Sequence, residues 1–157
     1  MSMDQDLYLQ NQLCFKLYTA SRLVIRGYQP MLKDLGITYP QYLVLLVLWQ
    51  ANEQGQLPLS LKALGSRLHL DSGTLTPLLK RMQQLGLLSR VRSEQDERQL
   101  QIALTEQGIA LAPKAKKWRE TLSEGLECQR PALTQLAQQL DEFIALLERN
   151  DLNLSFN

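Results

Sequence analysis

The stretch that decides the fold spans residues 71–108 and reads DSGTLTPLLKRMQQLGLLSRVRSEQDERQLQIALTEQG. Its first half repeats apolar residues at steps of three and four, which predicts an amphipathic helix ended by Gly86. Residues 87–104 then alternate apolar and polar side chains in two runs around a charged loop, which predicts a β-hairpin. We place the effective helix cap at Thr74, because Pro77 then falls where no backbone donor is required.

The other periodic segments are predicted to be helices. They lie at residues 8–33, from Pro40 onward with Thr38 as the cap, at residues 60–70, from Thr105 to about Cys128, and from Pro131 onward. Two short helices followed by a two-stranded hairpin make a winged helix-turn-helix. We therefore expect a mainly α fold with a small β-hairpin wing in one domain over residues 1–157. Residues 38–104 would form the DNA-binding lobe, and residues 8–34 and 105–150 the dimerisation helices.

Composition narrows the function classes. The 157 residues are 45% hydrophobic and carry a net charge of only +1, but residues 60–98 hold seven basic and four acidic side chains, which favours a polyanionic partner. A polar start and the lack of a long apolar run predict a cytoplasmic protein. One histidine and two separated cysteines offer no metal-ligand spacing, so we expect no metal. We also expect no cofactor and no catalytic residues.

Hydroxyl and charged side chains lie on the helix face away from the leucines and on the hairpin. We predict DNA binding by Ser72, Thr74, Thr76, Lys80, Arg81, Arg90, Arg92, Asp96 and Arg98. Arg98, at the hairpin tip, suits a minor groove, and Asp96 is close enough to orient it. For the helix alone, a solvated polar face is an equally good interpretation.

Residues 38–108 resemble the MarR family of dimeric winged-helix regulators, through a D-x-R wing at residues 96–98 and the following leucine–threonine pair. The blocks NQLCFKLYTASR (residues 11–22) and TYPQYLVLLVLW (residues 38–49) are similar to its organic-hydroperoxide-sensing branch, OhrR. The resemblance implies a homodimeric repressor on a pseudo-palindromic operator, with an organic hydroperoxide as inducer. It also implies that Cys14 is the redox-sensing residue.

Helix geometry sets how two tyrosines could serve Cys14. Tyr18 lies one turn away on the same face, whereas Tyr28 lies about 21 Å along a straight helix. Two such helices crossing antiparallel in a dimer would bring Tyr28 to the partner's cysteine. We assign thiolate activation to Tyr18 and Tyr28, because hydroxyl donors favour a charged sulfur and Cys14 is expected too deep in its helix to benefit from the dipole. Otherwise, Cys14 packs as a small hydrophobe beside two core tyrosines.

Several alternatives stay open. Cys128 is a possible resolving cysteine in an intersubunit disulfide, but a mixed disulfide with a small thiol is the other fate of oxidised Cys14. A repressor released by a small phenolic ligand is a second function, and a thiol peroxidase a third. Tyr39 and Tyr42 either line a pocket near the sensor or pack in the core. His69 either donates to a phosphate or is a solvated turn residue.

Overall fold

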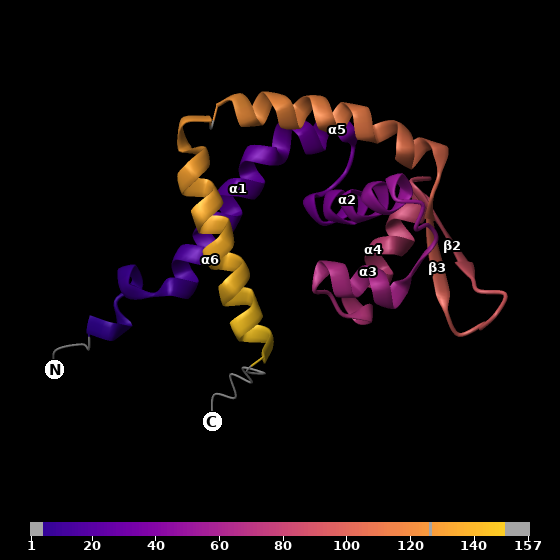
Figure 1. The fold of residues 1–157 in the computed structure, drawn as a ribbon, viewed down its shortest axis with the longest axis horizontal. Coiled ribbons are helices and arrows are strands. Elements are labelled where there is room, and N and C mark those ends of the chain that lie inside the picture. The colour runs from indigo at the N-terminus through magenta and orange to yellow at the C-terminus, as the bar shows by residue number, and fades with distance from the viewer. Residues whose placement is uncertain (1–4, 126, 150–157) are drawn as a thin grey trace. The chain divides into compact units, whose positions relative to one another are not determined.

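The computed structural model describes residues 5–125 and 127–149, most of them in helices (Figure 1). The α-helices are α1 Leu13–Leu35, α2 Tyr39–Glu53, α3 Leu61–Leu68, α4 Ser72–Gln84, α5 Glu106–Glu124 and α6 Arg130–Arg149. The strands are β1 Leu59–Ser60, β2 Leu88–Arg92 and β3 Leu100–Leu104. Short 3-10 turns lie at Gln5–Leu7, Leu9–Asn11 and Glu127–Gln129. The chain divides into two compact units, residues 1–116 and residues 117–157.

The predicted hairpin is confirmed. Strands β2 and β3 pair antiparallel, with Leu88 opposite Leu104 and Arg92 opposite Leu100. Strand β1 was not predicted. It adds a third antiparallel strand on the other side of β3, with Leu59 opposite Ile102. Two residues are too short for an alternating pattern, so pairing with β3 alone defines this strand. The mainly α fold with a small wing is thus as expected.

One apolar core lies between the C-terminal end of α1, helices α2 to α4 and the sheet. Its largest fully buried side chains are Tyr42, Met31, Leu45, Leu48, Leu64, Leu75, Leu79, Met82, Leu88, Ile102 and Val44. Figure 1 shows α2, α3 and α4 gathered beside the β2–β3 hairpin. The start of α2 is as predicted, since Thr38 is the cap and its N–H donates to Gln41 Oε1 at 2.9 Å. Within the described ranges, no helix is long and apolar enough to cross a membrane.

The cap of helix α4 lies three residues before the predicted one. Asp71, not Thr74, is the N-cap, and its Oδ1 accepts from the N–H of Thr74 at 2.7 Å. Pro77 therefore lies inside the helix and leaves the Gly73 carbonyl without its usual i+4 donor. The prediction failed because the carboxylate cap outweighs the local preference of proline for a first turn.

Helix α1 begins later than predicted. The segment before it forms two 3-10 turns, because the side-chain amides of Asn11 and Gln12 bond to the backbone carbonyls of Gln5, Asp6 and Tyr8. Hydrogen bonding by these amides competes with the α-helical ladder. At the other end, Gly36 closes α1 in the left-handed conformation, with φ 68°, as expected.

Helix α5 begins as predicted and ends earlier. Thr105 Oγ1 accepts from the N–H of Gly108 at 3.1 Å, which is the expected cap. The helix ends at Glu124, so Cys128 lies outside it, in the Glu127–Gln129 turn. Near the start of α6, Pro131 is the second helical residue, where its missing donor costs nothing.

Candidate DNA interface and thiol site

Helix α4 presents the predicted polar face. Leu75, Leu79 and Met82 are buried, while the side chains predicted to contact DNA are exposed: Ser72, Thr74, Thr76, Lys80 and Arg81. At the start of the helix, hydrogen bonds from the backbone and side chain of Thr74 lower the pKa of Asp71 below its ordinary value. The cap is therefore a carboxylate at neutral pH, and it keeps the first turn of α4 ordered.

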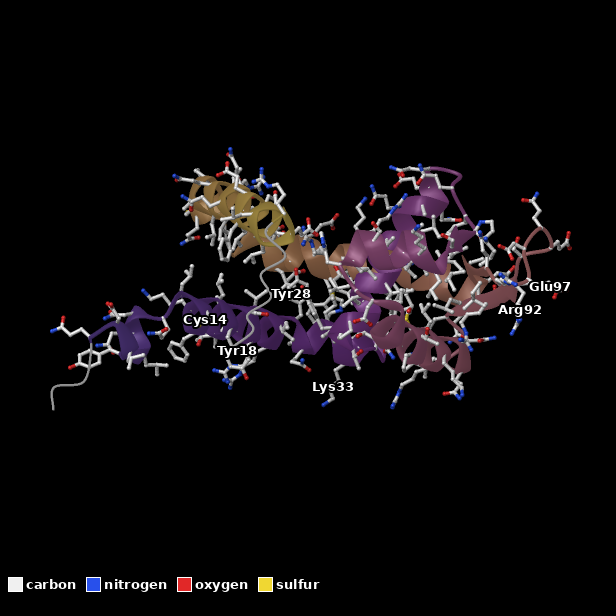
Figure 2. All side chains as sticks on the ribbon, turned by 90° about the horizontal axis from the view of Figure 1, so that it is seen from below. Cys14, Tyr18, Tyr28, Lys33, Arg92 and Glu97 are labelled. Carbon is white, nitrogen blue, oxygen red and sulfur yellow. The ribbon has the colours of Figure 1, made fainter. Side chains whose placement is uncertain are left out.

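The two arginines of strand β2 both donate hydrogen bonds within the protein. Arg90 is half-buried, and its Nε donates to Gln83 Oε1 of α4 at 2.7 Å. Arg92 is exposed, and its guanidinium donates to the Glu97 carbonyl at 3.3 Å across the hairpin loop (Figure 2). Sequence reasoning missed Gln83, because a contact between a helix and a strand leaves no local pattern. Arg90 thus fixes β2 on helix α4, and its phosphate contact stays a prediction.

Asp96 and Arg98 are joined through the backbone. Asp96 Oδ1 accepts from the N–H of Arg98 at 3.0 Å, and the Asp96 carbonyl accepts from the N–H of Gln99 at 2.9 Å. The Asp96 carboxylate therefore fixes the conformation of the loop before β3, and with it the position from which the Arg98 side chain extends. The prediction was that Asp96 is close enough to orient Arg98, and the contact observed between the two residues runs through the Arg98 backbone.

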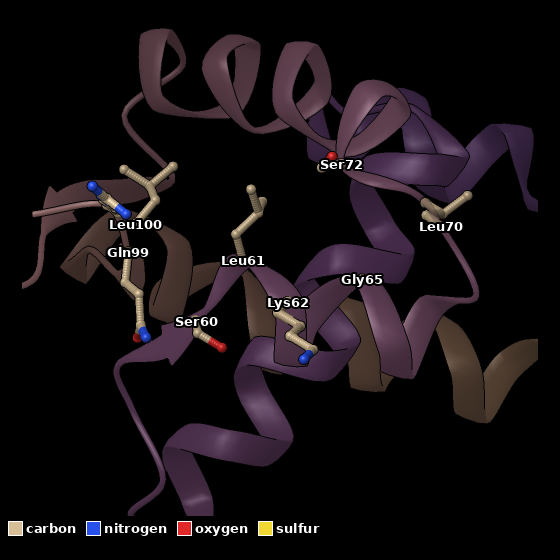
Figure 3. A pocket seen from close by; sticks show the side chains of 9 residues that line it. Ser60, Leu61, Lys62, Gly65, Leu70, Ser72, Gln99 and Leu100 are labelled. Carbon is tan, nitrogen blue, oxygen red and sulfur yellow. The ribbon is translucent and has the colours of Figure 1, made fainter. Parts of the chain in front are cut away.

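A cavity of about 500 Å³ opens beside Arg98 (Figure 3). Its lining residues are Ser60, Leu61, Lys62, Gly65, Leu70, Ser72, Arg98, Gln99 and Leu100. They come from the start of α3, the start of α4 and the wing. Two cations and two hydroxyl groups around an apolar floor, with no acidic side chain in the lining, suit a polyanion backbone. Because Lys62 lines this cavity, we add it to the residues predicted to contact DNA.

The thiol site lies at the start of α1. Cys14 is the second residue of the helix, and its thiol is free and exposed in a single chain. The prediction that Cys14 is too deep for a dipole effect is therefore wrong, because the helix begins at Leu13. The N–H groups of Leu13, Cys14 and Phe15 at this end lack helical partners and favour a negative charge. The free thiol Cys128 is also exposed and lies in the other compact unit.

Tyr18 is accessible one turn after Cys14. Its side chain is 64% exposed, and the Arg22 guanidinium lies over its ring, 5.1 Å from the centroid. Sequence reasoning missed Arg22, whose i+4 spacing was the available signal. Figure 2 shows Cys14 and Tyr18 near one end of α1 and Tyr28 further along the helix. Within one chain, these three side chains do not form one cluster.

Tyr28 packs against α2 instead. Its ring centroid lies 5.5 Å from that of Tyr39 and 5.8 Å from that of Tyr42. These are favourable aromatic distances, and Tyr42 is buried in the core. The structure thus brings Tyr39 and Tyr42 to the predicted sensor tyrosine. No group of three or more His, Cys, Asp or Glu side chains that could hold a metal ion occurs among the described residues.

Known proteins match most of this chain. A family model described as transcriptional regulator SarA/Rot matches residues 26–115. The organic hydroperoxide resistance transcriptional regulator of Bacillus subtilis is 55% identical over 107 residues, 68% of this chain and 69% of that protein. The regulator SarZ of Staphylococcus haemolyticus is 40% identical over 141 residues, 90% of this chain and 92% of that protein.

AbfR of Staphylococcus epidermidis is similar in structure. Its reduced form bound to DNA is 42% identical, with a TM-score of 0.66 over 87% of this chain and 93% of that one. Its disulfide form is 38% identical, with a TM-score of 0.65 over 87% of this chain and 92% of that one. This chain therefore belongs to the MarR-type winged-helix transcriptional regulators, in the branch of the SarA/Rot proteins and the organic hydroperoxide resistance regulators.

Proposed function

We propose that this chain is a homodimeric DNA-binding repressor that leaves its operator when an organic hydroperoxide oxidises Cys14. The observation that carries the proposal is the position of Cys14. A free, exposed thiol stands in the first turn of α1, one turn before Tyr18, in a member of a family of DNA-binding regulators. Relatives solved in reduced, DNA-bound and disulfide forms support a redox-controlled repressor.

A second copy of the chain accounts for the exposed apolar side chains. In a single chain, Leu13, Leu23 and Val24 of α1 are all more than half exposed. Helix α6 buries none of its residues, although it carries an apolar seam at Leu133, Leu136, Leu140, Phe143 and Leu147. Apolar surface on two long helices is typical of an interface between subunits. These helices are the proposed dimerisation elements, and α2 to β3 are the proposed reading lobe.

The chemistry at Cys14 is a single oxygen transfer. The thiolate attacks the terminal oxygen of the hydroperoxide, the O–O bond breaks, and the departing alkoxide takes up a proton to become an alcohol. Cys14 is left as a sulfenic acid. The first turn of α1 supports the negative sulfur through its unpaired N–H groups. The hydroxyl groups of Tyr18 and of Tyr28 from the second subunit complete the proposed activation.

Cys128 is the proposed resolving residue. Its thiol attacks the sulfenic sulfur, water leaves, and a disulfide between subunits forms. Peroxide treatment of the wild type should then give a covalent dimer on a non-reducing gel. Cys128→Ser should stay monomeric on that gel and take up a small thiol at Cys14 instead. A covalent dimer in Cys128→Ser would refute this pairing.

One hydroperoxide is consumed for each subunit, so the protein is a switch and not an enzyme. Its DNA target places its action in the cytoplasm. Quantifying peroxide loss in the presence of excess dithiothreitol separates the two roles. A repressor that is reduced only slowly consumes about one equivalent per chain in the first minutes. Sustained consumption of many equivalents would favour a peroxidase.

DNA release is tested by fluorescence anisotropy. Labelled DNA from upstream of the protein's own gene is titrated at physiological salt, with and without cumene hydroperoxide. The wild type should bind tightly when reduced and be released by the peroxide, whereas Cys14→Ser should bind and stay bound. If both proteins bind and neither responds, the DNA-binding assignment survives and the sensor assignment falls.

A further inference from the structure

The aromatic cluster beside Tyr28 extends away from the sensor helix. Tyr42 contacts Tyr28 on one side, and on the other side its ring meets Trp49 edge-on, with centroids 6.3 Å apart. Tyr42 and Trp49 stand seven residues apart, two turns along α2. One row of rings therefore runs from α1 along α2.

Trp49 connects this row to the first turn of α5. Its indole N–H donates to the carbonyl oxygen of Gly108 at 2.9 Å, a contact between residues 59 positions apart. Gly108 belongs to the first turn of α5, and its own N–H donates to the capping hydroxyl of Thr105 at 3.1 Å. The same hydroxyl donates to the carbonyl of Gly86 at 2.6 Å. Gly86 lies two residues after the last residue of α4, with φ 73°.

The contacts from Tyr28 to Gly86 are therefore continuous. They pass through Tyr42, Trp49 and the start of α5, and they end at the turn between the DNA-reading helix and strand β2. The backbones of α5 and Leu87 are in close contact at this turn, since a Cβ atom on Gly108 would lie 2.1 Å from the Leu87 carbonyl oxygen. Close-packed interiors have low compressibility and transmit strain.

We propose that Trp49 is a positioning residue for DNA release, which ties the tyrosine cluster at Tyr28 to the turn that follows the DNA-reading helix. The inference rests on the proposed redox function. When oxidation of Cys14 withdraws the partner contact from Tyr28, its ring shifts against Tyr42, and Trp49 passes the shift to the Gly108 carbonyl. The indole N–H is central to this task, because it donates a directional hydrogen bond from the aromatic row to the first turn of α5.

The first test is Trp49→Phe in the full-length dimer. Phenylalanine keeps an aromatic ring against Tyr42 and removes the donor to Gly108. Operator Kd is measured before and after cumene hydroperoxide, and the readout is the ratio of oxidised to reduced Kd. We expect that ratio to fall by roughly 3- to 10-fold relative to the wild type, the range that one hydrogen bond contributes. Cys14 should be oxidised at the wild-type rate, as followed by thiol labelling.

Trp118→Phe is the matched control, because it removes the other indole, in α5 beyond the turn. Its Kd ratio should equal that of the wild type. A purely structural role for Trp49 predicts that Trp49→Phe weakens both forms equally and leaves the ratio unchanged, which would overturn the proposal. Release that fails in the wild type as well overturns the proposed redox function together with this inference.

A second measurement does not depend on the folding of Trp49→Phe. In Trp118→Phe, Trp49 is the sole tryptophan, and its emission reports the indole environment. Peroxide should shift this emission to longer wavelength and raise its quenching by iodide, and Cys14→Ser combined with Trp118→Phe should show neither change. An unchanged spectrum while DNA is released would show that Trp49 does not take part.

Discussion

Replacing Gly108 with alanine should destabilise the junction of α4, β2 and α5. The added Cβ would stand 2.1 Å from the Leu87 carbonyl oxygen and 3.1 Å from Leu104 Cδ2. Real Cβ atoms essentially never approach closer than 3.0 Å, so backbone must move by about 0.9 Å. Overpacking of this kind costs about 3 kcal/mol when backbone is the obstacle, and the better helix propensity of alanine returns about 1 kcal/mol. The net loss of about 2 kcal/mol should lower Tm by roughly 4–8 °C.

The assay is thermal unfolding followed by circular dichroism at one fixed protein concentration, since the Tm of a dimer depends on concentration. Gly27→Ala is the matched control, because Gly27 also lies within a helix and a Cβ there meets nothing within 4 Å in a single chain. The control should hold or raise Tm. A Gly108→Ala protein as stable as the wild type would show that the close approach of α5 to Leu87 does not hold this junction.

Three further predictions concern α4 and its contacts. Asp71→Asn keeps a capping oxygen but no titratable charge. Because the pKa of Asp71 is lowered in the folded protein, its carboxylate stabilises the fold above its ordinary pKa of about 3.9. This stabilisation is lost as the pH falls through the folded pKa, so the difference in urea midpoint between wild type and variant should close below about pH 4. A difference that stays constant with pH contradicts this. Lys80→Gln should reduce the slope of log Kobs, the observed DNA-binding constant, against log salt by about 0.9 for each subunit. Arg90→Gln should leave this slope unchanged, because Arg90 bonds to Gln83. Equal slopes in the two variants would refute the distinction. Pro77→Ala restores an N–H inside α4 and should raise the unfolding free energy by up to about 3 kcal/mol in urea denaturation, and a loss of stability would contradict the account of this helix.

The reading lobe was predictable because its signals are local. The leucines of α4 recur with the helical period, and the hairpin strands alternate, so pattern alone gives both elements and the loop between them. Glycine is favoured just after a helix and threonine just before one. Gly86 follows α4 and Thr105 caps α5, as predicted. These features need no knowledge of distant residues.

The predictions were wrong where contacts between distant residues, or competition between neighbouring ones, determine the local structure. Strand β1 exists only through its pairing with β3, and Arg90 bonds to α4 across the fold. At the start of α4, two acceptable caps competed, and the carboxylate of Asp71 is the stronger acceptor. At the start of α1, the amides of Asn11 and Gln12 replace helical bonds with 3-10 turns. The last error is the one that matters for function, because it moves Cys14 from the interior of a helix to its first turn.

The position of Cys14 has a consequence for how a signal can reach DNA. Only the end of α1 far from the thiol is buried in the reading lobe, through Met31, Leu32 and Leu35. A 23-residue helix is about 35 Å long, so a covalent change at its first turn makes no direct contact with that lobe in its own subunit. Tyr28 of the other subunit is the nearest route in a dimer with antiparallel α1 helices. Oxidation in one subunit should therefore disturb the reading lobe of its partner. A heterodimer with one Cys14→Ser subunit tests this, because only one of its two subunits can be oxidised at Cys14.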